Sequence, residues 1–146
     1  MARVLYTAEA TVTGGRASGH GHTSDGALDV QLRTPPEMGG EGGGTNPEQL
    51  FAVGYAACFE SALGVVARRE HVDAGNVSID SRVSLVPTQD RGFNLEVELH
   101  VTLPQIQDPD EAARLVAAAH QVCPYSNATR GNIEVVLTAN GCSAGH

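Results

Sequence analysis

The sequence has 146 residues, a formal net charge of −8 and three cysteines, and its nine basic side chains are all arginine. Without a lysine the chain can build neither a Walker-type phosphate loop nor a Schiff-base active site. The acidic balance disfavours nucleic acids and anionic membranes as partners, because both attract clustered positive charge. At this length we expect a single domain that spans residues 1–146.

Apolar and polar residues alternate from Val4 to Val12 and again from Leu28 to Leu32. A period of two is typical of a strand with one buried face, so we predict two strands that form a hairpin or a meander. The stretch GGRASGHGH between them, with His20 and His22, is interpreted as a solvent-exposed loop. Residues 34–44 form a second loop, because five of the six positions 39–44 are glycine and exclude regular structure.

A long helix is predicted to begin directly after this loop. Asn46 is a suitable N-cap and Pro47 suits the first helical position. Thr45 with Glu48 is a competing capping box that would start the helix one residue earlier. We expect the helix to end near residue 70.

This helix is apolar on every side. From Leu50 to Ala67 its one charge is Glu60, and small residues dominate. Glu60 and Ser61 in the middle disfavour a membrane span, so we predict a central core helix.

The second half alternates strands with a further helix. Residues 77–85 and 93–103 predict an antiparallel hairpin with one dry face, joined by the loop PTQDRG. A helix opens at Asp108 with Pro109 first, and it runs to about Ala119. Residues 133–139 predict a last strand, and residues 139–146 a loose tail. This order of elements indicates an α+β fold.

Two cysteines are candidates for redox chemistry. Cys58 lies in the middle of the long helix, about three turns from its start, too far for the helix dipole to ionise it. A reactive Cys58 would need an arginine or a protonated histidine beside it. Cys123 lies at a helix end before a proline, a position that suits a thiol moving to meet another sulfur. Simple packing is the alternative for both residues.

A zinc site is a second alternative. His120 with Cys123, and Cys142 with His146, form two pairs at zinc-like spacing. They lack the tight CxxC arrangement of convincing zinc sites, so we predict no metal and interpret Cys142 as incidental.

Two long strings around the cysteines, GTNPEQLFAVGYAACFESAL and HQVCPYSNATRGNI, closely resemble the signature blocks of the organic hydroperoxide resistance (Ohr) proteins of the OsmC/Ohr superfamily. The opening YTAEATVTGGRASGHGHTSDGALDVQL is also similar to that family. The resemblance covers about residues 3–139. It implies that Cys58 is the peroxidatic cysteine, Cys123 the resolving cysteine, Arg16 the active-site arginine and Glu48 its carboxylate partner.

The resemblance implies a peroxidase that reduces organic hydroperoxides through a sulfenic acid on Cys58 and a Cys58–Cys123 disulfide. Dihydrolipoamide or a lipoylated protein is the implied electron donor, and no bound cofactor is expected. The apolar surroundings of Cys58 should favour alkyl or lipid hydroperoxides. We expect the substrate pocket to be lined by Leu50, Phe51, Tyr55 and Phe59.

The family fold implies an intertwined homodimer, with antiparallel sheets wrapped around two long central helices and active sites at the interface. The first ten residues lack the apolar run of a signal peptide, so we expect a cytoplasmic protein. A redox sensor on the same fold, which forms the disulfide without turnover, is the alternative function.

Overall fold

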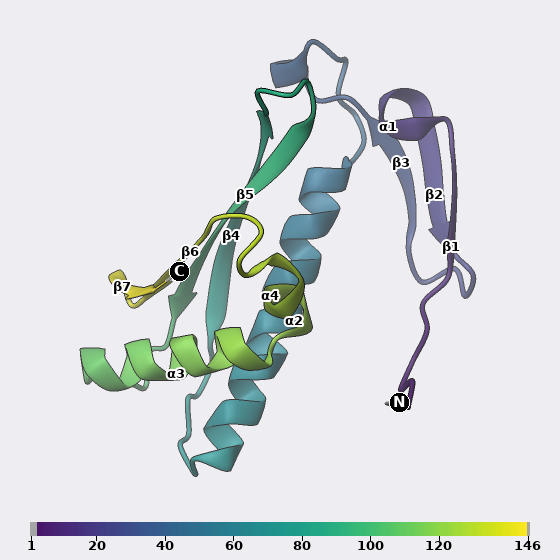
Figure 1. Ribbon diagram of the computed structural model, residues 1–146. Helices are drawn as coiled ribbons and strands as arrows, with labels where there is room; N and C mark the ends of the chain where they lie inside the picture. Colours follow the sequence, from purple (N-terminus) through teal and green to yellow (C-terminus); the bar gives the residue numbers. More distant parts are fainter. Residues whose placement is uncertain (1–2, 146) are drawn as a thin grey trace. The chain divides into compact units, whose positions relative to one another are not determined.

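The computed structural model describes residues 3–145. The chain divides into two compact units, Met1–Leu50 and Phe51–His146, and each is described by itself (Figure 1). The single domain expected from the sequence therefore stays a prediction.

The first unit is built on a three-stranded antiparallel meander, β1 (Ala10–Thr13), β2 (Gly19–Thr23) and β3 (Asp29–Arg33). A four-residue helix, α1 (Gly15–Ser18), joins the first two strands. The meander agrees with the predicted pairing. The glycine- and histidine-rich stretch, predicted as a loop, instead supplies the middle strand, because its backbone pairs with a strand on each side.

Two further predictions in this unit need correction. The first strand begins only at Ala10, and the apolar side chains of the preceding segment are largely exposed, with Leu5 at 84%. Residues 3–9 pair with no strand among the described residues, so their alternating pattern alone does not make a strand. The second loop contains one turn of 3-10 helix, Pro36–Met38, because Pro36 suits the first turn and Gly39 ends it at φ 86°.

Helix α2 (Pro47–Arg69) begins as predicted. The Asn46 Oδ1 accepts a hydrogen bond from the Gln49 N–H at 2.9 Å, which satisfies one of the free donors of the first turn. The competing capping box is absent, because the Thr45 hydroxyl donates to the side chain of Gln49 instead. Asn46 is therefore the N-cap.

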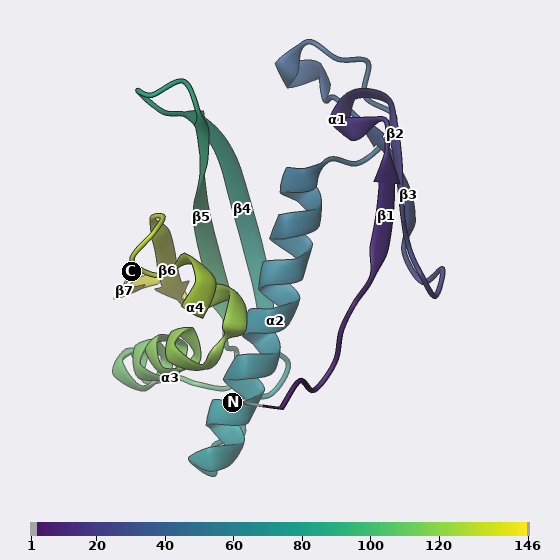
Figure 2. The same cartoon turned by 45° about the vertical axis from the view of Figure 1, so that its right-hand side comes forward.

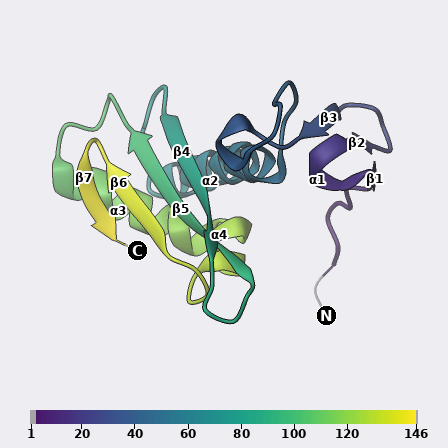
Figure 3. The same ribbon diagram turned by 90° about the horizontal axis from the view of Figure 1, so that it is seen from above.

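The second unit contains a four-stranded sheet in the order β4 (Ser78–Pro87), β5 (Phe93–Thr102), β6 (Val135–Ala139) and β7 (Cys142–Gly145) (Figure 3). The β4–β5 hairpin is antiparallel, as predicted. The sheet is mixed, however, because β5 and β6 run parallel. A parallel pair needs a long crossover, and helices α3 (Pro109–Val122) and α4 (Pro124–Thr129) form it.

Strand β7 corrects the predicted loose tail. Asn140 and Gly141 both have positive φ, 50° and 84°, and Ala139 pairs with Cys142. An Asn-Gly pair with this conformation makes the two-residue turn that matches the twist of a hairpin. Residues 142–145 therefore return along β6 and extend the sheet.

One continuous core fills the second unit. Helix α2 runs along the β4–β5 hairpin (Figures 1 and 2), and the buried side chains of α2, α3, β5 and β6 form one cluster. By length and composition alone α2 could cross a membrane. Its fully buried Tyr55, Phe59 and Leu63 belong to the core cluster instead, as predicted for a core helix.

Candidate active site

Cys58 and Cys123 lie on elements that bring their side chains together. Cys58 is half-buried near the middle of α2. Cys123 is fully buried at the joint between two helices: its N–H bonds to Ala119 at the end of α3, and its carbonyl accepts from Asn127 in α4. Pro124 starts α4. The first N–H of a helix has no partner within the helix, so a proline, which lacks this N–H, loses no hydrogen bond at that position.

The two thiols are free, and Cys58 packs against the buried cluster of side chains to which Cys123 belongs. Burial raises the pKa of the Cys58 thiol; the Tyr125 N–H lowers it, and the hydrogen bond and charge interaction with Cys123 raise it further. The surroundings of Cys58 thus hold it as a neutral thiol, and a nucleophilic Cys58 needs an added cation.

Arg16 and Glu48 are also brought together, within the first unit. Arg16 lies in α1, and its Nη1 and Nη2 donate to Oε1 and Oε2 of Glu48 at 2.7 Å and 3.3 Å. Glu48 stands in the first turn of α2, where a negative charge complements the helix dipole. The hydrogen bond to Glu48 raises the pKa of Arg16, so the guanidinium keeps its charge. The pair holds a planar cation in a fixed orientation.

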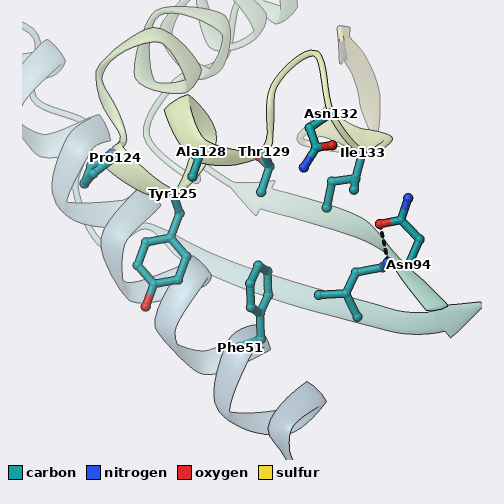
Figure 4. Close-up of a pocket in the computed structure, with 9 residues that line it drawn as sticks. Phe51, Asn94, Pro124, Tyr125, Ala128, Thr129, Asn132 and Ile133 are labelled. Atoms are coloured by element: carbon teal, nitrogen blue, oxygen red, sulfur yellow. Dashed lines mark hydrogen bonds between the residues drawn. The ribbon is translucent and has the colours of Figure 1, made fainter. Parts of the chain in front are cut away.

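An apolar cavity of about 530 Å³ lies beside α4 (Figure 4). Its size is within the range of small-molecule sites. Phe51 projects into it from α2, and Tyr125 and Ile133 come from the segment that follows Cys123. The full lining is Phe51, Asn94, Leu95, Pro124, Tyr125, Ala128, Thr129, Asn132 and Ile133.

Of the four pocket residues expected from the sequence, only Phe51 lines this cavity. Tyr55 and Phe59 are fully buried in the core, and Leu50 is half-buried in the first unit. Because α2 is apolar on every side, the pattern of apolar residues in its sequence does not show which of them face the core and which face the cavity. The residues after Cys123 were missed for a different reason: the helix α4 that presents them was not predicted.

Gly54 explains how Tyr125 reaches α2. A Cβ at Gly54 would stand 2.8 Å from the Tyr125 hydroxyl and 3.3 Å from the ring. Glycine inside a helix lowers stability relative to alanine, so its presence needs a local reason. Here it leaves room for the Tyr125 ring, which packs against Phe51 with centroids 5.8 Å apart.

Among residues 3–145, no three His, Cys, Asp or Glu side chains are grouped to hold a metal ion. His146, one member of the alternative zinc set, lies outside the described residues. Cys142 is exposed on β7, and His120 is buried in α3.

The chain matches the family model of OsmC-like proteins over residues 40–138. It is 56% identical over 140 residues to the organic hydroperoxide resistance protein of Xanthomonas axonopodis pv. citri. This alignment covers 93% of this chain and 95% of the relative. It is 46% identical over 134 residues to the organic hydroperoxide resistance protein OhrB of Bacillus subtilis, covering 91% of this chain and 96% of the relative.

A crystal structure of an organic hydroperoxide resistance protein from Legionella pneumophila superposes with a TM-score of 0.88 at 53% identity, over 93% of this chain and 98% of the other. The fold is thus that of the OsmC-like class of proteins. Within this class the chain belongs to the organic hydroperoxide resistance (Ohr) family, which confirms the resemblance found in the sequence.

Proposed function

We propose that this protein is a cysteine-based peroxidase that reduces organic hydroperoxides to alcohols. The observation that carries the proposal is the packing of two free thiols, Cys58 and Cys123, in one cluster, next to an apolar cavity whose wall includes Pro124 and Tyr125. The relatives are named for organic hydroperoxide resistance, which supports a role in resistance to organic peroxides.

In the first step, the Cys58 thiolate attacks the outer oxygen of the hydroperoxide. The O–O bond breaks, Cys58 is oxidised to a sulfenic acid, and the alkoxide takes a proton and leaves as the alcohol. Because its immediate surroundings raise the pKa of Cys58, this step needs a positive charge. We assign that charge to Arg16, oriented by its two bonds to Glu48.

In the second step, the Cys123 sulfur attacks the sulfenic sulfur of Cys58. A disulfide forms and water leaves, which protects Cys58 from oxidation to sulfinic acid. A dihydrolipoyl group then reduces the disulfide by thiol–disulfide exchange and becomes the cyclic lipoyl disulfide. No bound cofactor is required in this cycle.

The cavity favours substrates with an alkyl or lipid chain. Phe51, Leu95 and Ile133 offer apolar surface that a small polar peroxide would not use. Hydrogen peroxide gains nothing from such a wall, so the proposal predicts discrimination between the two substrate classes.

We further propose an intertwined cytoplasmic homodimer with the active sites at its interface. One side of α2 supports this, since small residues line a second hollow there and Val53 is 71% exposed. A second copy of the chain would cover this surface. Sedimentation at several concentrations tests the assembly, and a monomer throughout would contradict it.

The proposed activity is tested by steady-state consumption of cumene hydroperoxide and of hydrogen peroxide, with dihydrolipoamide as reductant. We expect turnover with cumene hydroperoxide, much slower turnover with hydrogen peroxide, and none in Cys58→Ser. Cys123→Ser should complete about one turnover and then accumulate sulfinic acid on Cys58. Disulfide formation without turnover in the wild type would instead identify a redox sensor.

A further inference from the structure

Tyr55 is fully buried, and its hydroxyl forms hydrogen bonds with two polar side chains. It lies in α2, three residues before Cys58, and lines no part of the apolar cavity. Its hydroxyl oxygen is 2.8 Å from the Ser126 Oγ and 3.0 Å from the Thr129 Oγ1, both in α4. These bonds join residues more than 70 positions apart, and all three side chains are buried.

One assignment of donors pairs all three hydroxyl protons of this group. The Thr129 hydroxyl donates to the Ser126 carbonyl at 3.3 Å, which uses its only hydrogen. In this assignment Tyr55 donates to Thr129, and Ser126 donates to Tyr55. All three hydroxyl protons are then paired in one continuous chain, as buried hydroxyl groups require.

Helix α4 carries the groups that face Cys58. Cys123 caps its start, and the backbone N–H of Tyr125 lowers the pKa of the Cys58 thiol. The far end of the same helix is fixed to α3, because the Arg130 Nη1 donates to the His120 carbonyl at 2.8 Å. The hydroxyl chain is thus a polar tie between α4 and the helix that carries Cys58.

We propose that Tyr55 is a positioning residue, whose hydroxyl anchors α4 on α2 and so holds Cys123 where it can close the disulfide with Cys58. This inference rests on the proposed function for its role in the catalytic cycle. The anchoring itself concerns only the two thiols and is testable without a peroxide.

The consequence is a competition at the sulfenic acid of Cys58. Attack by Cys123 gives the disulfide and water, whereas reaction with a second hydroperoxide gives sulfinic acid and a second alcohol. A disulfide requires an S–S distance near 2 Å and a narrow range of Cβ separations. A loosened α4 should therefore slow the first reaction and leave the second unchanged.

The test uses Tyr55→Phe, which keeps the ring and removes the hydroxyl. We measure the hydroperoxide concentration that inactivates half of the enzyme, and detect sulfinic Cys58 by mass spectrometry. In Tyr55→Phe this concentration should fall about tenfold, because a reacting group misplaced by a fraction of an ångström reacts more slowly. The rate of sulfenic acid formation, trapped with dimedone, should stay at the wild-type value.

Ser126→Ala should behave like Tyr55→Phe, and the double variant should lose no more than either single variant. Tyr6→Phe removes an exposed hydroxyl and is the control.

A second readout is the equilibrium of the Cys58–Cys123 disulfide with dithiothreitol, which needs no peroxide. We expect the equilibrium constant for disulfide formation to fall by about the same factor in Tyr55→Phe and in Ser126→Ala. The inference would be overturned if both variants showed the wild-type half-inactivating hydroperoxide concentration and the wild-type equilibrium constant with dithiothreitol. If the wild type consumes no hydroperoxide, the proposed function fails, while the dithiothreitol equilibrium still decides the anchoring.

Discussion

Arg16 and Glu48 stand 32 positions apart in the sequence and meet through two parallel hydrogen bonds, at 2.7 Å and 3.3 Å. Their side chains are 36% and 16% exposed, so the pair sits at the edge of solvent. Pairs of this exposure contribute little to folding. We therefore interpret the pair as a means of orienting a cation and not as a structural tie.

Arg16→Lys should separate these two roles. Lysine keeps the charge but cannot form the paired bonds of a guanidinium, so we expect kcat/KM for cumene hydroperoxide to fall about a hundredfold, as for the loss of one oriented electrostatic contact. The free energy of unfolding should change by no more than about 1 kcal/mol. Urea unfolding and steady-state kinetics measure the two effects, and Glu48→Gln should show the same pattern in weaker form. Wild-type kinetics in Arg16→Lys would contradict the assignment.

Phe51 and Phe59 lie two turns apart on α2 and should respond differently to truncation. Phe59 is fully buried in the core, so Phe59→Ala should cost about 3–5 kcal/mol of stability. Phe51 is half-buried and lines the cavity, so Phe51→Ala should cost less stability but lower kcat/KM for cumene hydroperoxide about tenfold. Hydrogen peroxide, which has no apolar group to bind, is the control substrate. An equal loss for both substrates in Phe51→Ala would remove this residue from the pocket.

Gly54 and Gly64 form a matched pair within the same helix. Alanine has the higher helix propensity by about 1 kcal/mol, so Gly64→Ala should stabilise the fold: its Cβ meets only the end of the flexible Arg68 side chain, at 3.4 Å. Gly54→Ala should instead destabilise by about 1–3 kcal/mol, because its Cβ would displace the Tyr125 ring.

Denaturant unfolding of Gly54→Ala and Gly64→Ala at one protein concentration checks the opposite signs. Gly54→Ala should also raise KM for cumene hydroperoxide, since Tyr125 forms part of the cavity wall. Stabilisation by both substitutions would mean that Tyr125 can move aside without cost.

Local signals in the sequence predicted much of the fold. Asn46 and Pro47 placed the start of α2 correctly, and Asp108 with Pro109 placed the start of α3, where the Asp108 side chain accepts from the Asp110 N–H. Such signals act within a few residues and need no tertiary context. The parallel pairing of β5 and β6 had no local signal, because it depends on a crossover of about thirty residues.

Two signals were present but misread. The Asn140-Gly141 turn that creates β7 is a recognisable hairpin sequence, and Pro124 starts a new helix as readily as it ends the previous one. For the site, family resemblance paired Arg16 with Glu48, a contact that periodicity could not predict. The same periodicity could not separate Phe51 in the cavity from Tyr55 and Phe59 in the core.

His120 predicts a loss of stability in acid. Only 3% of the residue is exposed, and neither ring nitrogen has a hydrogen-bond partner within residues 3–145. Burial lowers the pKa of His120 below its usual 6.5, and the positive charge of Arg130 lowers it further. The folded state therefore keeps the ring neutral at a pH where the unfolded chain has already bound a proton.

The sign follows from the protons bound in each state. Well above pH 6.5 neither state is protonated at His120 and the full stability is present. As the pH falls below this value the unfolded state binds more protons, so stability decreases by up to about 1.4 kcal/mol per pH unit until the folded pKa is reached. His120→Gln cannot titrate, so its free energy of unfolding should fall less steeply between pH 6.5 and pH 5 than that of the wild type. Urea titrations at several pH values and one protein concentration measure both slopes, and identical slopes would show that His120 is protonated equally in the two states.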